Sequence, residues 1–237
     1  VRAVELYYRP VKRIATNVNA FYQSQMRLNT PSLGTLLPES FLSVAESTEQ
    51  CSALFRLGFV QILRTMHEMG EKGTAPQFAS IYMPVRYLLR DKAPTELVEL
   101  CTKLEVEPNE ICFELSTDLL FQTAGTAAAV VAALASEGFR FMMSGFGAAG
   151  CPIVGLAPFP MDIVILDEAL CLAAGRGERE NACVKALVGL ASQLGAEIAA
   201  PSFDREQDRI LGEMGCIYSI SGDFMSSRYA FRKKSTT

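Results

Sequence analysis

A glycine-rich stretch, residues 138–150 (GFRFMMSGFGAAG), contains the first residues whose placement suits chemistry. Residues 139–143 are apolar apart from one arginine, which is typical of a buried strand, and a glycine-rich turn follows them. The alanine-rich run 123–137 predicts a helix that ends at Gly138, because glycine commonly terminates helices. In β/α proteins the loop after a strand is the usual place for functional groups, so residues 144–147 are candidates for a site.

Groups that act as nucleophiles or as soft metal ligands are few and scattered. The one histidine, His67, falls in a segment with helical spacing, and we expect it on a helix surface. The seven cysteines include no C-x-x-C pair, and most have apolar neighbours, which favours buried free thiols in a reducing compartment. We therefore expect no zinc site and no unrelated barrel enzyme built on a nucleophile–histidine pair. A cytoplasmic location is expected, either free or as the cytoplasmic part of a membrane-anchored protein.

The composition is that of a globular protein with a substantial core. The chain has 237 residues, of which 49% are hydrophobic and 20% charged. Its net charge of −4 gives no basic field for a nucleic-acid polymer, and it has no apolar run long enough for a membrane span. We expect no signal peptide, because the opening residues lack that pattern. Because the sequence begins in a strand-like segment without Met, we expect a piece of a longer multidomain protein. Residues 1–231 are predicted to form a single domain and 232–237 a flexible basic tail.

Strand and helix patterns alternate along the chain. Strands are expected at residues 4–8 (stopped by Pro10), 19–28, 78–83, 111–116, 139–143, 162–166, 196–200 and 216–219. Helices are expected at residues 38–46, 50–69, 95–104 (capped by Thr95), 118–137, 180–194 and 203–214. This alternation is typical of parallel βαβ units, and about eight strands favour a closed β/α barrel. The competing architecture is an open doubly wound sheet, but the glycine fingerprint usual in that fold is missing after the first strand.

The order of these segments resembles the EAL family, the bacterial phosphodiesterases that hydrolyse cyclic di-GMP. VELYYRPV at 4–11 is similar to the family's opening ELYYQPIV, and LPESFLSVAE at 37–46 is similar to its P-x-x-F-I-x-x-A-E segment. LAPFPMDIVILD at 156–167 is similar to L-x-x-L-P-v-D-x-l-K-I-D. Further segments match in order: 21–28 the Glu-Ala-Leu signature strand, 111–118 the LELTES strand, 139–147 the Asp-Asp-Phe-Gly loop, and 187–203 and 211–227 the last two strands with their flanks. The resemblance implies an α/β fold, a modified eight-stranded, TIM-like β/α barrel with an antiparallel first strand.

The resemblance also implies where a metal site belongs. The family holds two divalent cations, Mg²⁺ or Mn²⁺, at the C-terminal mouth of the barrel, mainly through carboxylate and amide oxygens. Glu114 stands where the family has a metal ligand. The other matching positions depart from the pattern: Gln23 for the signature Glu (with Ser24 and Gln25 after it), Tyr82 for Asn, Ser144 and Gly145 for paired Asp, Ile165 for the Lys that positions the nucleophile, Pro201 for Glu, Ser221 or Ile220 for a Gln, and Arg9 for the opening Gln.

These departures predict a domain without phosphodiesterase activity and without a resident metal. One retained carboxylate does not neutralise two divalent ions. We expect Glu114 to pair with an arginine such as Arg27, the alternatives being a residual weak metal ligand or a solvated carboxylate. Asp162 and Asp167 flank an apolar strand, at positions where the family also has acidic residues. A structural role at the strand ends is expected there as much as a role in the family's site.

The sequence therefore favours a catalytically inactive regulatory or protein-interaction module in bacterial signalling, with no cofactor. The apolar loop 147–160 matches a family segment that takes part in dimerisation, so it is expected to form a homodimer or partner surface, or else a packed lid. The alternative function is a non-hydrolysing receptor for cyclic di-GMP. Arg27 matches the family arginine that approaches a phosphate, and Arg9 adds a second cation beside Gln23, Gln25 and Glu114.

Overall fold

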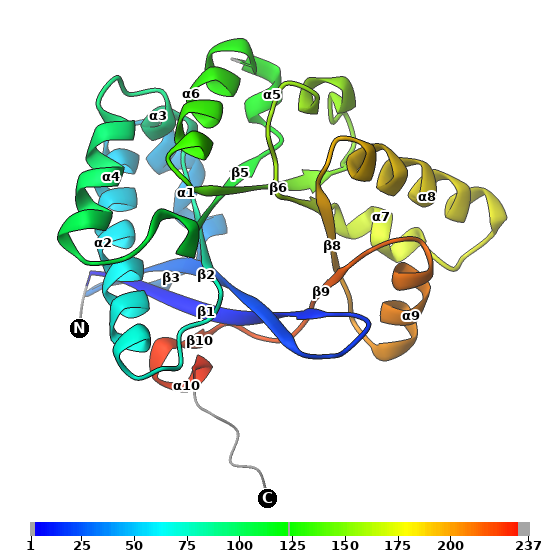
Figure 1. Ribbon diagram of the computed structural model, residues 1–237, viewed down its shortest axis with the longest axis horizontal. Coiled ribbons are helices and arrows are strands. Elements are labelled where there is room, and N and C mark those ends of the chain that lie inside the picture. The colour runs from blue at the N-terminus through cyan, green and yellow to red at the C-terminus, as the bar shows by residue number, and fades with distance from the viewer. Residues whose placement is uncertain (1–2, 123, 232–237) are drawn as a thin grey trace, which may run out of the picture.

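The computed structural model describes residues 3–122 and 124–231, in which eight strands close a barrel (Figure 1). The strand order around the barrel is β1-β2-β4-β5-β6-β7-β8-β9, and β1 closes the ring by pairing with both β2 and β9. The barrel strands are β1 (Val4–Arg13), β2 (Asn19–Thr30), β4 (Ala79–Tyr82), β5 (Ile111–Ser116), β6 (Arg140–Phe146), β7 (Ile163–Leu166), β8 (Glu197–Pro201) and β9 (Tyr218–Ile220). Two short strands, β3 (Gly34–Leu36) and β10 (Met225–Ser226), extend the sheet beside β2 and β1.

The first strand has the direction that the family resemblance implies. β1 is antiparallel to β2 and to β9, whereas the pairs from β2 and β4 round to β8 and β9 are parallel. The prediction that Pro10 stops this strand is wrong, because β1 continues to Arg13. Pro10 lies after Tyr8, which pairs with β10, and before Val11, which pairs with β9. One edge of the strand therefore has no recorded partner at Pro10, which is where a residue without an N–H group is tolerated.

Helices surround the barrel strands on the outside (Figure 1). They are α1 (Pro38–Glu46), α2 (Gln50–Glu71), α3 (Val85–Leu88), α4 (Ala93–Lys103), α5 (Leu119–Gln122), α6 (Ala124–Ser136), α7 (Glu168–Ala173), α8 (Glu178–Gln193), α9 (Arg205–Glu213) and α10 (Ser227–Ala230). Two short 3₁₀ helices, Pro108–Glu110 and Ile153–Leu156, lie in the connections. The predicted helix 118–137 corresponds to α5 and α6, and Thr123 between them is outside the described residues. Thr95 is not the cap of α4, because the helix already begins at Ala93, with a proline in its first turn where the missing N–H needs no partner.

The end of α6 fixes how the chain enters β6. Gly138 has φ +99°, and its N–H donates to the carbonyl of Ala135 while the N–H of Phe139 donates to Leu134. This is the paired hydrogen-bond pattern of a Schellman motif, and it confirms the predicted glycine cap. The strand that follows is longer than predicted, because Ser144 and Gly145 belong to β6 rather than to a loop. The register with β7 shifts after Ser144, so Gly145 (φ +85°) forms a bulge within the strand.

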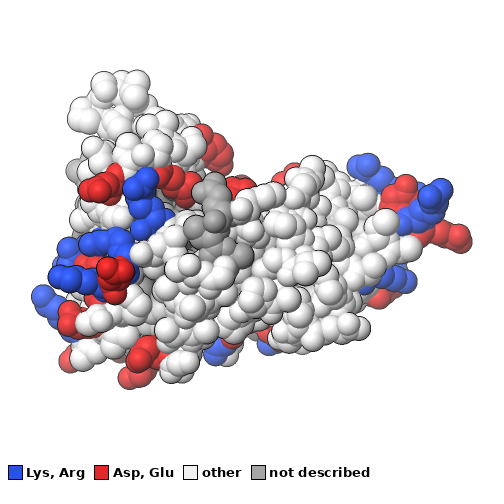
Figure 2. Space-filling view, turned by 90° about the horizontal axis from the view of Figure 1, so that it is seen from above, with Lys and Arg blue, Asp and Glu red and all other residues white. Residues whose placement is uncertain are grey.

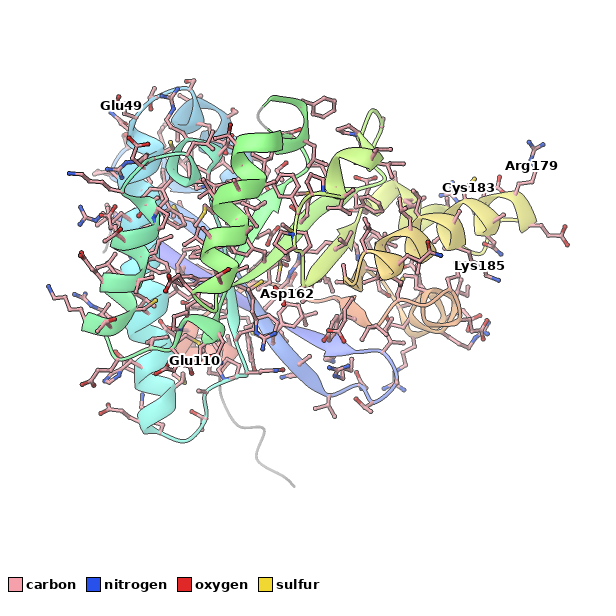
Figure 3. All side chains as sticks on the ribbon, turned by 45° about the horizontal axis from the view of Figure 1, so that its top comes forward. Glu49, Glu110, Asp162, Arg179, Cys183 and Lys185 are labelled. Carbon is pink, nitrogen blue, oxygen red and sulfur yellow. The ribbon has the colours of Figure 1, made fainter. Side chains whose placement is uncertain are left out.

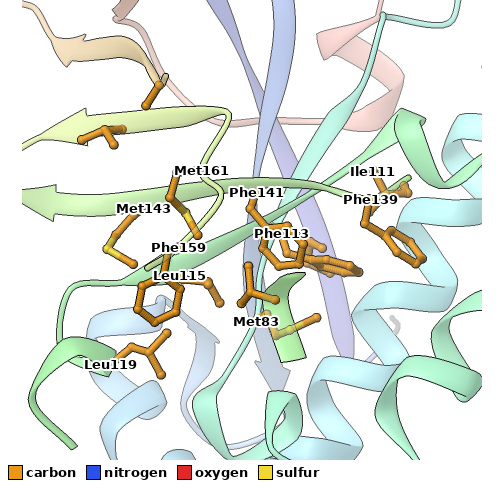
Figure 4. Close-up of a cluster of buried hydrophobic side chains, with 14 of the residues drawn as sticks. Met83, Ile111, Phe113, Leu115, Leu119, Phe139, Phe141, Met143, Phe159 and Met161 are labelled. Atoms are coloured by element: carbon orange, nitrogen blue, oxygen red, sulfur yellow. The ribbon is translucent and has the colours of Figure 1, made fainter. Parts of the chain in front are cut away.

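Two apolar cores result from the alternation of side chains along the strands. Phe113, Leu115, Phe141 and Met143 point outward and pack in the cluster under the helices (Figure 4). The residues between them point into the barrel, where a second cluster fills the interior: Val11, Phe21, Phe78, Cys112, Met142, Ile163, Ile165, Ala199, Tyr218 and Ile220. The barrel is therefore packed below its mouth and has no open channel along the described strands.

Other sequence predictions have these outcomes. All seven cysteines lie within the described residues and have free thiols. A helix long and apolar enough to cross a bilayer is missing from the described part of the chain. The basic tail predicted at 232–237 lies outside the described residues.

Candidate functional site

The carboxyl ends of the parallel strands bring most of the predicted site residues to one mouth of the barrel. In the strand register Tyr82 lies opposite Glu114, and Ser144 lies opposite Ile165. Arg9 on β1 lies opposite Gln23 on β2. Because these residues occupy the inward-facing positions of their strands, they form one layer above the apolar interior.

Glu114 is held by a short chain of hydrogen bonds. The Gln23 Nε2 donates to Glu114 Oε2 at 2.7 Å, and the Arg9 Nε donates to Gln23 Oε1 at 2.8 Å. Gln23 is only 6% exposed, so both ends of its amide are used inside the protein. The Arg9 guanidinium also lies 4.4 Å from the centroid of the Phe224 ring. An amide suits this place because it accepts from the arginine and donates to the carboxylate at the same time.

The two charged groups of this network compensate each other. Burial raises the pKa of the Glu114 carboxyl above its ordinary value, although hydrogen bonds from Gln23 and Ser144 and the charge of Arg9 act in the opposite direction. Burial also lowers the pKa of the Arg9 guanidinium, and the nearby Glu114 carboxylate opposes that shift. Each group therefore partly replaces the water that the other has lost.

Arg27 is not the partner of Glu114, which corrects the sequence prediction. Its guanidinium carbon lies 3.8 Å from the centroid of the Tyr7 ring, and its Nε donates to Gln25 Oε1 at 3.3 Å. Arg27 lies four positions after Gln23, or roughly 13 Å along β2. The carboxylate thus has an arginine neighbour of the expected type, but it comes from β1 and acts through Gln23.

The remaining predicted positions supply few free oxygen donors. The Tyr82 hydroxyl donates to the Glu46 carboxylate at the end of α1. Ile165 is 6% exposed and belongs to the apolar cluster of the barrel interior. Pro201 ends β8, and Ser221 follows β9 directly. A Cβ atom built on Gly145 would lie 3.1 Å from Thr117 Oγ1, and the positive φ adds strain, so this backbone disfavours an aspartate there.

The donor set at the mouth does not fit the two divalent cations that the family resemblance implies. Such ions need several charged oxygens, and among the family's ligand positions only Glu114 has a carboxylate, which is already hydrogen-bonded and lies near a guanidinium. Across residues 3–122 and 124–231, no group of three or more His, Cys, Asp or Glu side chains is placed to hold a metal.

A cavity that the sequence did not predict adjoins the mouth. Its volume is about 240 Å³, and Arg9, Gln23, Gln25, Tyr82 and Glu114 form its polar edge. Its remaining wall is mostly apolar and comes from α1, α2, β2, β4 and the segment after β9: Ser24, Met26, Pro38, Phe41, Leu42, Ala45, Cys51, Leu54, Phe55, Ile81, Pro84 and Phe224. The sequence predicted the helix at 38–46, but which strands α1 faces is a property of the tertiary structure.

The two aspartates that flank β7 have structural roles. Asp167 caps α7 by accepting from the Ala169 N–H at 3.0 Å. Asp162 accepts from the Phe141 N–H at 2.8 Å and lies 3.9 Å from the Arg140 guanidinium (Figure 3). His67 lies on α2, with its side chain about one-third exposed, as the sequence predicts.

The loop 147–160 is part packed and part exposed. Leu156 and Phe159 are buried and anchor it to the outer core. Val154, in the 3₁₀ helix that follows β6, is 85% exposed, and Phe121 on α5 is 58% exposed. A Cβ on Gly155 would lie 3.3 Å from Leu120, so the turn packs closely on α5. The loop thus combines features of both predicted alternatives, a lid with buried anchors and an exposed apolar surface.

Comparison with known proteins identifies the family of the chain. The family model described as the EAL domain matches residues 2–227. The chain belongs to the EAL domain family. Among curated relatives, it is 26% identical over 228 residues to the cyclic di-GMP phosphodiesterase RocR of Pseudomonas aeruginosa, a match that covers 94% of this chain and 57% of RocR. It is 23% identical over 194 residues to the cyclic di-GMP phosphodiesterase PdeR of Escherichia coli, covering 81% of this chain and 29% of PdeR. The EAL domain described here therefore spans little more than half of the first relative and under a third of the second.

Solved structures share the fold of this EAL domain. The PaMucR phosphodiesterase in complex with cyclic di-GMP matches with a TM-score of 0.86 at 18% identity, over 96% of this chain and 94% of that one. The FimX EAL domain of Pseudomonas aeruginosa bound to cyclic di-GMP matches with a TM-score of 0.81 at 15% identity, over 92% of this chain and 87% of that one. These likenesses establish the modified barrel with its antiparallel first strand.

Proposed function

We propose that this EAL domain is a catalytically inactive regulatory module that acts through protein contacts in bacterial signalling. The observation that carries the proposal is the network at the barrel mouth. Glu114, the carboxylate that matches a family metal ligand, is engaged by Gln23 and compensated by Arg9. A group already satisfied in this way gains little by binding a cation that must first displace its partners.

The chemistry of phosphodiester hydrolysis supports the same proposal. An in-line attack at phosphorus needs a water activated at neutral pH and positive charge near the developing oxyanion. In this chain the position of the family lysine is Ile165, which has no titratable group and is buried. Arg9 supplies one positive charge, but its Nε already serves Gln23, and a guanidinium does not activate water.

The decisive assay is hydrolysis of cyclic di-GMP with Mg²⁺ and with Mn²⁺, using an active EAL phosphodiesterase as the positive control. We expect no product above the blank without enzyme. Turnover at the rate of the control would refute the inactive module and with it the argument from the donor set.

The exposed apolar side chains near α5 support a contact surface for a protein partner or a second copy. Val154 and Phe121 project from the loop 147–160 and from α5. The face on the side of α5 and α6, seen from above in Figure 2, has a broad area with few charged residues between charged groups at its two ends. An apolar area of this kind is typical of association surfaces. A cytoplasmic location, expected from the free thiols, is part of the same proposal.

Sedimentation velocity tests the self-association form of this surface. Val154→Glu is expected to shift a concentration-dependent dimer to monomer. Val44→Glu, on the exposed face of α1 and itself 67% exposed, serves as the matched control and should leave the dimer intact. A wild-type dimer that survives Val154→Glu would exclude this surface, and a wild-type monomer at all concentrations would exclude the homodimer.

A non-hydrolysing receptor for cyclic di-GMP is the second candidate. The observation that favours it is Arg27, whose half-buried guanidinium is held on the Tyr7 ring and is available to a phosphate. Isothermal titration of the wild type and of Arg27→Ala tests it. Saturable heat that is lost in Arg27→Ala would favour the receptor, and the absence of heat at high micromolar ligand would exclude it.

A further inference from the structure

A second hollow, separate from the barrel mouth, lies on the outer surface between α2 and the segment 86–100. We call it the arginine groove. Its volume is about 1120 Å³, and the eleven described residues that line it are Glu49, Ser52, Ala53, Arg56, Leu57, Val60, Gln61, Arg64, Arg86, Arg90 and Leu100. The groove shares no lining residue with the cavity at the mouth or with the loop 147–160. Figure 2 shows Lys and Arg side chains gathered at the end of the molecule where α2, α3 and α4 lie in Figure 1, with acidic groups among them.

Arginine dominates the charge of this groove. Its four arginines are all exposed: Arg56, Arg64, Arg86 and Arg90. The rest of the chain has a net charge of −7, because the four arginines and Glu49 account for +3 of the total of −4. An acidic ligand is therefore attracted to the groove and repelled by the remainder of the protein, which directs it to this one place.

Two of the arginines are held in place by a glutamate of α4. The Glu96 carboxylate, whose side chain is 16% exposed, lies 2.6 Å from Arg56 Nε and 3.6 Å from Arg90 Nη1. The Tyr87 hydroxyl donates to the same carboxylate at 3.0 Å. A guanidinium has five N–H groups, so both arginines keep donors for a carboxylate from outside. Their positions are thus fixed before a ligand arrives, which lowers the entropy cost of binding.

The charges of the other two arginines are not compensated. Neither Arg64 nor Arg86 is in an ion pair with another described residue, and the Arg86 Nε donates to the backbone carbonyl of Glu46 at 3.3 Å. Even when both Glu49 and Glu96 are counted, the groove has two positive charges in excess. These two arginines are therefore where an acidic ligand gains most.

The groove also has an apolar floor. Leu57 is 54% exposed, and Ala53, Leu57 and Val60 follow one another on α2 at spacings of four and three residues, which places them on one side of the helix. Leu100 adds an apolar side chain from α4. The lining residues of α2 from Ser52 to Arg64 extend over roughly 18 Å at about 1.5 Å per residue, which is the length of about three helical turns.

These features together select the kind of occupant. None of the eleven described lining residues is aromatic, so nucleic-acid bases have no ring to stack on in the groove. A hollow with an apolar floor suits an inserted segment better than the flat surface of a bilayer. Carboxylates on both sides of an apolar stripe would complement the arginines and the floor at the same time.

We propose that the arginine groove docks an acidic amphipathic helix of a partner protein. The apolar stripe of that helix lies on Leu57 and Val60, and its carboxylates bind the arginines, Arg64 and Arg86 above all. The inference goes beyond the proposed function, because it requires neither an inactive mouth nor association through the loop 147–160.

The probe that tests the proposal is a synthetic helical peptide. It has about 20 residues, with leucine at every third or fourth position and glutamate on both sides of the leucine stripe. One control peptide has the same composition in shuffled order, and a second has lysine in place of glutamate. Fluorescence anisotropy of the labelled peptides is measured against the 237-residue chain. We expect saturable binding of the acidic helix alone, weakened when NaCl is raised from about 50 mM to about 500 mM.

Charge reversal locates the binding on the protein. Arg64→Glu combined with Arg86→Glu should weaken binding of the acidic helix by at least roughly tenfold. Arg179→Glu combined with Lys185→Glu is the matched control, because it changes the net charge equally on the exposed face of α8 (Figure 3). The control should change the affinity by less than about threefold, since its charges lie outside the groove.

A second pair of variants tests the apolar floor without changing charge. Leu57→Ser should weaken binding of the acidic helix by at least roughly threefold, whereas Leu172→Ser, 40% exposed on α7, should not. Circular dichroism reports whether each variant folds, and if the double arginine variant does not, the two leucine variants decide.

The proposal is overturned if the wild type does not bind the acidic helix saturably, or if the shuffled or lysine peptide binds equally well. It is also overturned if the folded groove variants bind as the wild type does. Binding of anionic lipid vesicles or of a DNA duplex that is lost in the double arginine variant, without binding of the peptide, would assign the groove to those ligands and would likewise overturn it.

Discussion

Replacing Gln23 by Glu restores the first residue of the family signature, and we expect it to destabilise the protein. In the wild type the Gln23 Nε2 donates to Glu114 Oε2 at 2.7 Å. A carboxylate has no hydrogen to donate, so the variant places two acceptors at a hydrogen-bond distance inside a half-buried mouth. Either one of them takes up a proton or the two charges repel.

The loss of unfolding free energy is set by whichever of these two responses, repulsion or protonation, has the lower free-energy cost. Two unit charges 2.7 Å apart repel by about 6 kcal/mol at an effective dielectric constant of about 20. Keeping a proton on a carboxyl with an ordinary pKa of about 4.3 costs about 4 kcal/mol at pH 7, so protonation is favoured. The proton also restores a hydrogen bond between the two carboxyl groups, and burial already raises the pKa of Glu114, which together offset about 1 kcal/mol of this. The expected loss at neutral pH is therefore about 2 to 3 kcal/mol of unfolding free energy.

The sign of the pH dependence distinguishes this cause from simple misfit. The folded pKa of the carboxyl pair is raised, so the cost is absent below the ordinary pKa of about 4 and grows as pH rises towards the folded pKa. Urea unfolding of wild type and Gln23→Glu at about pH 5 and about pH 7.5 should show a gap that is small in acid and wide near neutrality. Gln25→Glu is the matched control, because its side chain lies against Arg27 and the new charge gains a partner there.

Addition of Mg²⁺ gives the sharpest contradiction of our reasoning. Millimolar Mg²⁺ should not restore the stability of Gln23→Glu, because the other family positions still lack charged oxygens. Rescue by Mg²⁺ would mean that the mouth needs only one further carboxylate to hold a cation. Equal stability of Gln23→Glu and wild type at both pH values would refute the electrostatic argument itself.

Three further predictions concern the scaffold. Gly138→Ala should lower the unfolding free energy by about 1 to 2 kcal/mol, because φ is +99° at this position. Gly125→Ala, in the exposed first turn of α6, should instead raise it by up to about 1 kcal/mol. Chemical denaturation measures both variants, and a shift of the same sign in the two would contradict the glycine cap. Asp204→Ala should cost about 1 kcal/mol by removing the acceptor of the Gln207 N–H at 2.8 Å, with Asp204→Asn nearly neutral, and equal losses in both would exclude capping. In a thiol-reagent titration of the native protein at mild alkaline pH, the exposed Cys183 on α8 (Figure 3) should react fastest, and its loss in Cys183→Ser should remove the fast phase. Burial raises the pKa of three other thiols to about 12, and these should react only after unfolding: Cys101, Cys171 and Cys216.

Local patterns gave the elements of the barrel well where the determinants are local. The predicted strand 111–116 is the observed β5, and the predicted helix 38–46 is the observed α1. Apolar runs, a proline in the first helical turn and a glycine after the last one all act within a few residues of the chain. The short strands β3 and β10 and the six-residue helix α7 were not predicted, because elements of this size depend on what they pair with or pack against.

The sequence by itself determined which site positions have lost their charged or metal-binding groups. Gln23, Gly145 and Ile165 have these side chains in any fold, and the inference that the mouth is poor in oxygen ligands needs no coordinates. Only the tertiary structure decided which of these side chains contact one another. The arginine that Glu114 reaches, through Gln23, is Arg9 rather than Arg27. The antiparallel β1 brings Arg9 opposite Gln23, whereas Arg27 lies further along β2. The cavity beside the mouth arises in the same way, since its walls come from elements distant in sequence, and no local pattern fixes the space left between side chains that only folding brings together.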